Sequence, residues 1–144
     1  MNIKADKMRY QMNNLAYMFI LLGMAISVVA LFRIITPKTI IPDFDIAIEI
    51  LINIVLLLLT FLTAERCKYY QKKWGIVSFV IAGVHVLRIL YVPKSLLALG
   101  QITSGQFAII VLLLIVSAAS LVFGGVLTII RSNILTNHLK EIGE

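Results

Sequence analysis

The sequence predicts an all-α integral membrane protein whose four transmembrane helices form a small bundle. The 144 residues are 60% hydrophobic and only 14% charged, and the mean hydropathy is +1.00. A soluble globular domain has about 45–50% apolar and about 25% charged residues, and disordered chains combine low hydrophobicity with high net charge. The composition therefore excludes both classes, and four long apolar runs indicate a chain that is embedded in a bilayer.

Each apolar run is close to the length of about 20 residues that a helix needs to cross a bilayer. Pro37 and Pro42 follow the first run and forbid its continuation as a helix. Glu65 follows the second run, Pro93 closes the third and Arg131 follows the fourth. No small-residue cleavage motif follows the first run, so we expect a retained span rather than a signal peptide. The expected spans of this single membrane domain (residues 1–144) are 15–33, 46–64, 74–92 and 106–131.

The segment after the fourth span is expected to continue as a helix. Its apolar residues repeat at roughly helical spacing, at Ile134, Leu135, Leu139 and Ile142. We therefore expect residues 132–144 to form a cytoplasmic amphipathic tail that lies along the lipid headgroups or along a partner.

The connection between the third and fourth spans, residues 93–106, is expected to be the longest outer loop. It is half apolar, and residues 95–99 are expected to form one interfacial helical turn that Gly100 ends. The alternative is a re-entrant segment, which requires neighbouring protein or a water-filled cavity to satisfy its backbone groups.

The distribution of basic residues predicts the orientation of the spans. The N-terminal tail, the second connection and the C-terminal tail together carry nine Lys and Arg residues, whereas the opposite side carries four. Loops rich in Lys and Arg stay in the cytoplasm. We therefore expect both termini in the cytoplasm and the chain in the plasma membrane, specifically a bacterial cytoplasmic membrane. The net charge of +6 is then explained by anionic headgroups, with no nucleic acid as a partner.

Small residues mark the faces by which we expect the spans to pack. Transmembrane helices associate through small residues that let two backbones approach closely. The first span carries such a face, and so do the third and the fourth. We expect these three spans to pack closely and the second to be bulkier and more exposed to lipid. The expected packing residues are Gly23, Ser27, Ser78, Ala82, Ser117, Ser120 and Gly124.

Four ionisable residues are expected to lie in the outer third of the bilayer: Arg33, Glu49, His85 and Arg88. Each intramembrane charge costs about 2.5–3.5 kcal/mol on insertion scales, so each needs a structural or functional reason. In one interpretation Glu49 pairs with an arginine, the arginines extend to the headgroups and His85 hydrogen-bonds across helices. In the other, Glu49, His85 and Arg88 line a polar site that binds an anionic group or relays protons. Contact with a partner subunit is a third possibility.

No catalytic, cofactor-binding or metal-binding motif is present. The single cysteine, Cys67, excludes an internal disulfide and a cysteine-based zinc site. The two histidines, His85 and His138, fall on opposite expected sides of the membrane, and phosphate-binding and serine-hydrolase motifs are missing. We therefore expect a protein that is not an enzyme and has no cofactor.

These observations favour two functional hypotheses over a third, a pore-forming or holin-like protein or a membrane enzyme. The first is a non-catalytic accessory or assembly subunit of a larger membrane complex, such as a transporter. The alternative is a small oligomeric membrane transporter or channel with an outer-leaflet polar site. The expected partners are membrane lipids together with other membrane protein subunits or further copies of this chain.

Overall fold

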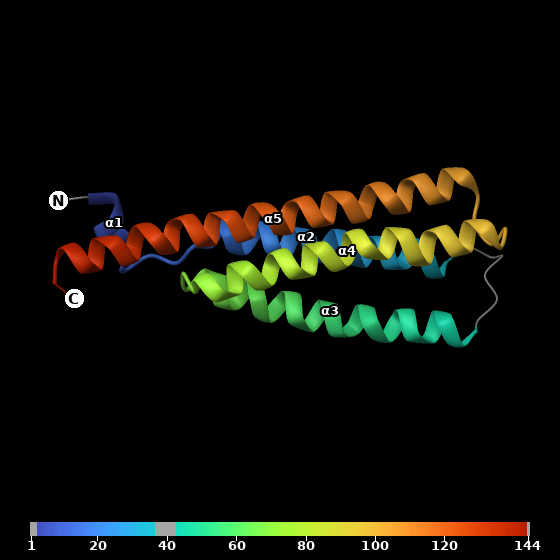
Figure 1. Cartoon of the computed structure of the whole chain (residues 1–144), viewed down its shortest axis with the longest axis horizontal. Coiled ribbons are helices and arrows are strands. Elements are labelled where there is room, and N and C mark those ends of the chain that lie inside the picture. The colour runs from blue at the N-terminus through green and yellow to red at the C-terminus, as the bar shows by residue number, and fades with distance from the viewer. Residues whose placement is uncertain (1–2, 37–42, 144) are drawn as a thin grey trace.

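The computed structural model describes residues 3–36 and 43–143, which form five helices (Figure 1). Four of these helices are long and apolar enough to cross a membrane, which confirms the expected all-helical fold with four candidate spans. The orientation of the termini remains a prediction. The helices are α1 (Ile3–Met8), α2 (Asn14–Ile35), α3 (Phe44–Lys68), α4 (Lys72–Ala98) and α5 (Ser104–Glu141).

Polar side chains cap the N-terminal ends of α3 and α5. Asp43 caps α3 by accepting a hydrogen bond from the backbone N–H of Ile46 at 3.0 Å. Thr103 and Gln106 form a capping box at the start of α5. Between α3 and α4 the chain reverses through Tyr70, whose φ of 59° is left-handed. Pro37 and Pro42, which were expected to end the first span, lie outside the described residues.

The expected end of the third span at Pro93 is wrong, because α4 continues through this proline to Ala98. Pro93 lacks an N–H and so cannot bond to the carbonyl of Ile89, but the rest of the helical hydrogen bonding can continue beyond it. The continuation buries Leu96 against Ala30 and Ile34 of α2. The expected separate turn at 95–99 is thus the last part of α4 and its cap, and the connection to α5 is only residues 99–103.

The longest helix, α5, is the centre of the bundle and packs against both α2 and α4. On one side, a Cβ added at Gly23 would lie 3.0 Å from the carbonyl oxygen of Ser117. On the other side, a Cβ added at Gly125 would lie 2.8 Å from the carbonyl oxygen of Gly75. The backbones therefore approach as closely as glycine permits.

Serine hydroxyls bond these helices together within the same contacts. Ser117 Oγ donates to the carbonyl of Gly23 at 2.7 Å, and Ser120 Oγ donates to the carbonyl of Phe19 at 2.6 Å. From α4, Ser78 Oγ donates to the carbonyl of Leu121 at 2.7 Å. All seven expected packing residues are buried, namely Gly23, Ser27, Ser78, Ala82, Ser117, Ser120 and Gly124.

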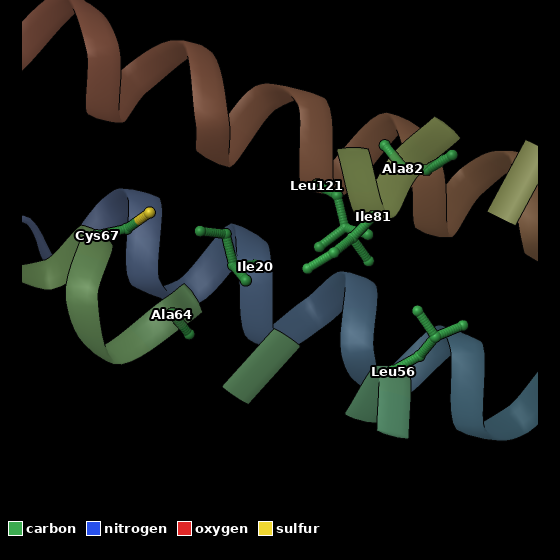
Figure 2. Packing of buried hydrophobic residues seen from close by; sticks show 8 residues of the cluster. Ile20, Leu56, Ala64, Cys67, Ile81, Ala82 and Leu121 are labelled. Carbon is green, nitrogen blue, oxygen red and sulfur yellow. The ribbon is translucent and has the colours of Figure 1, made fainter. Parts of the chain in front are cut away.

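The third helix, α3, lies at the periphery and packs mainly on α2. One apolar cluster joins all four long helices, and in it Leu56 and Cys67 of α3 meet residues of α2, α4 and α5 (Figure 2). The lipid-facing side of α3 is bulky, with Leu51 and Leu58 more than 60% exposed.

The described part of the tail continues α5 without a break to Glu141. At 38 residues α5 is about 57 Å long, nearly twice the hydrocarbon thickness of about 30 Å. Near its C-terminal end α5 contacts α1, and His138 Nε2 lies 3.6 Å from the carboxylate of Asp6. In Figure 1, α1 and the C-terminal end of α5 lie at the same end of the molecule.

The close contact between α4 and α5 predicts that Gly125→Ala destabilises the bundle. Its added methyl group would overlap the carbonyl oxygen of Gly75, so we expect a loss of about 1–3 kcal/mol, typical of overpacking. The matched control is Gly83→Ala, whose methyl group would meet nothing within 4 Å. This control should be neutral or more stable by up to about 1 kcal/mol. Unfolding midpoints in detergent test both variants, and equal midpoints would contradict the packing described.

Candidate functional site

The central feature of the candidate site is a buried ion pair between Glu49 of α3 and Arg88 of α4. Arg88 Nη2 donates to Glu49 Oε1, and the two residues are only 5% and 7% exposed. They are separated by 39 positions in the sequence, so tertiary packing brings them together. The sequence left both Arg33 and Arg88 as possible partners of Glu49, and in the structure the partner is Arg88.

Asn53 and His85 each contact the member of the ion pair that lies on the same helix. Asn53 Nδ2 donates to Glu49 Oε1 at 2.9 Å and to the Glu49 carbonyl at 2.7 Å. Arg88 Nη1 lies 3.3 Å from His85 Nδ1. Arginine can only donate, so Nδ1 accepts and the proton of a neutral His85 sits on Nε2.

This geometry decides one detail of the first interpretation and adds one residue. That interpretation expected His85 to hydrogen-bond across helices, but the contact in the structure is with Arg88, three positions along α4. The reason is that helical spacing places positions i and i+3 side by side on one face. Asn53 was not among the candidates, although its position four residues after Glu49 on an expected helix is the signal that could have found it.

Arg33 does not join this cluster. It is an exposed residue in the last turn of α2. There it lines a separate hollow of about 220 Å³ with Thr36, Gln106 and Ile109. The four candidate residues therefore divide into a buried trio of Glu49, His85 and Arg88 and one exposed arginine that lines a different hollow.

A groove of about 550 Å³ separates the first part of α3 from the last part of α4, and the ion pair lies in its wall. Figure 1 shows that α3 diverges from α4 toward the end where α3 begins. Acidic Asp43 and Asp45 line the groove where α3 begins, and Lys94 lines it from α4. Most of the remaining wall is aliphatic and includes Ile34, Ile48, Ile52, Leu90, Leu96 and Leu99.

The charges of the cluster are better suited to holding α3 and α4 together than to binding a ligand. Glu49 and Arg88 neutralise each other, so an anion at Arg88 would have to compete with a carboxylate that is already bonded. One donor is left over, because Arg88 Nε is buried without a hydrogen-bond partner in the described part of the chain. Within residues 3–36 and 43–143, no three His, Cys, Asp or Glu side chains are grouped to hold a metal ion.

A second surface feature lies on the outer side of α4, around Gly83. A Cβ added at Gly83 would meet nothing within 4 Å. Large aliphatic side chains surround it at helical spacing and are 52–65% exposed, namely Ile76, Val80 and Leu87. We call these four residues the α4 outer face. Gly83 forms a notch in it near the middle of the helix.

Comparisons with protein families, with curated proteins and with solved structures find no match to this chain.

The buried ion pair predicts a specific pattern of stability. Glu49→Leu leaves the Arg88 charge buried without its partner and should destabilise the bundle by about 3–5 kcal/mol. The double variant Glu49→Leu/Arg88→Leu removes both charges and should recover most of that loss. The control Arg33→Leu, at an exposed position, should leave the unfolding midpoint unchanged. The pairing is refuted if the double variant unfolds no later than Glu49→Leu in the same detergent.

Proposed function

We propose that this chain is a non-catalytic accessory subunit of a larger membrane complex, such as a transporter. In this proposal it sits in a bacterial cytoplasmic membrane with both termini in the cytoplasm, and a transmembrane helix of another subunit packs on the α4 outer face. The observation that carries the proposal is the exposed notch at Gly83.

A glycine inside a helix is less favourable than alanine by about 0.5–1 kcal/mol. Four of the six glycines within the long helices have a close neighbour at their missing Cβ, namely Gly23, Gly75, Gly124 and Gly125. Gly105 in the first turn of α5 meets only the Thr103 hydroxyl at 3.9 Å, and Gly83 meets nothing within 4 Å in the described residues. Nothing in the part of the chain that the structure describes therefore accounts for a glycine at this position. A helix that approaches from outside would account for it, because a notch allows the close backbone contact by which membrane helices associate.

The seven expected packing residues do not serve an outside partner, because all of them are buried inside the chain. A partner helix must therefore use a different surface. The α4 outer face offers a notch flanked by long aliphatic side chains, which is the shape that accepts a knob from another helix.

The second candidate function is a small oligomeric transporter or channel, and the groove with its buried polar trio favours it. The trio lies near one end of the bundle, however, and the hydroxyls of Ser78, Ser117 and Ser120 deeper in the bundle are bonded to backbone carbonyls. A conducting path would therefore have to form between several copies of the chain. In that case the α4 outer face would join identical chains.

The variant Gly83→Leu tests the accessory role without disturbing the fold, since its side chain would enter open space. The chain is purified from its own cells through a C-terminal tag in mild detergent, and subunits are counted by native mass spectrometry. The native chain should carry a different membrane subunit in fixed stoichiometry. Gly83→Leu should reduce its retention about tenfold or more, as expected from filling a packed notch.

The matched control is Ala119→Leu, which adds the same side chain at an exposed position near the middle of α5. This control should retain the partner. If native chains instead form a discrete homo-oligomer that Gly83→Leu breaks, the transporter candidate is favoured. If Gly83→Leu and Ala119→Leu retain partners equally, the α4 outer face is not the contact.

A further inference from the structure

We propose that the groove between α3 and α4 binds one phospholipid whose headgroup carries both a phosphate and a primary amine. This site is independent of the accessory role, which rests on the α4 outer face.

The groove has the depth of one leaflet. Along α3 it is lined from Asp43 to Ile52, which at 1.5 Å per residue is about 14 Å. Half of the hydrocarbon core of a bilayer is about 15 Å. A molecule that fills the groove would therefore extend from the headgroup region to near the middle of the bilayer.

The wall of the groove suits an acyl chain. The groove of about 550 Å³ is lined by the aliphatic side chains of Ile48, Ile52 and Leu90, against which a flexible acyl chain can pack.

The groove is charged at its mouth and aliphatic further in, which is the order of polar and apolar parts along a phospholipid. The charged side chains of Asp43, Asp45 and Lys94 are exposed and lie where α3 begins and α4 nears its end. Deeper positions on α3 are occupied by Ile48 and Ile52. A lipid that lies in the groove would place its headgroup among the charges and its chain among the aliphatic residues.

The charges at the mouth select the headgroup. Glu49 and Arg88 neutralise each other, so the remaining charges among the described lining residues are the carboxylates of Asp43 and Asp45, where α3 begins, and the ammonium of Lys94 on α4. A phosphate can pair with Lys94 while a primary amine donates hydrogen bonds to the carboxylates. An anionic glycerol headgroup would leave the carboxylates without a cation, and a quaternary choline has no N–H to donate.

Arg88 contributes to the wall of the groove but offers a lipid no free hydrogen-bond donor. It is 93% buried and paired with Glu49, and its unpartnered Nε has almost no accessible surface. The selection of the headgroup therefore depends on Asp43, Asp45 and Lys94.

The test is a lipid competition read by native mass spectrometry. The purified chain is incubated with an equimolar mixture of phosphatidylethanolamine, phosphatidylcholine and phosphatidylglycerol, and bound lipids are counted. We expect one tightly held lipid per chain, with the ethanolamine lipid preferred. Asp45→Asn should reduce that preference about two- to fivefold, as expected for a partly exposed charge pair.

A pair of tryptophan variants locates the lipid. Ile52→Trp fills the groove from a position that is 41% exposed and should remove the bound lipid. Leu58→Trp adds the same bulk on the exposed side of α3, away from the groove residues, and should retain the lipid. Unfolding midpoints of both variants should stay near that of the native chain.

Three outcomes would overturn the proposal. Equal binding of the three lipids removes the headgroup selection, and equal lipid counts for Ile52→Trp and Leu58→Trp place the lipid elsewhere. Loss of a protein subunit rather than a lipid from Ile52→Trp makes the groove a subunit site. Gly83→Leu should not change the lipid count, so failure of the lipid site and failure of the accessory role are distinguishable.

Discussion

The structure depends on the close approach of the α5 backbone to α2 and α4. Apolar side chains gain little by associating in lipid, so packing and interhelical hydrogen bonds must hold the bundle. Gly124 and Gly125 illustrate the arrangement. Successive helical residues differ in direction by about 100°, and Gly124 faces Ala16 and Ile20 of α2 whereas Gly125 faces Gly75 of α4. Two adjacent glycines thus let one helix pack tightly on two sides.

The peripheral position of α3 follows from this arrangement. Because α5 occupies the centre, α3 contacts it little and packs mainly on α2, with a weaker contact to α4. The Glu49–Arg88 pair is the polar link between α3 and α4 near the end where they diverge. A buried ion pair adds little net stability, but leaving one charge unpaired is costly, so the pair favours one register of the two helices.

The two surfaces proposed to bind partners are separate and differ in chemistry. The α4 outer face is apolar and has a notch, which suits another helix. The groove combines an aliphatic wall with charged residues at its mouth, which suits an amphiphile. A membrane subunit that binds a lipid on one side and a protein helix on another can have both properties, since neither surface uses the residues of the other.

The sequence alone determined the features that depend on single side chains. Hydropathy predicted four spans, and the positions of Glu49 and Arg88 within them indicated one membrane depth. Helical spacing also identified the small residues, because periodicity follows from local geometry. Only the tertiary structure decided that α4 passes through Pro93, since the burial of Leu96 favours continuation. It also distinguished Gly75 from Gly83, two glycines of one helix of which only the first meets a neighbour. Hydropathy and size are properties of single residues, whereas the course of α4 and the contacts of its glycines depend on which helices pack against each other.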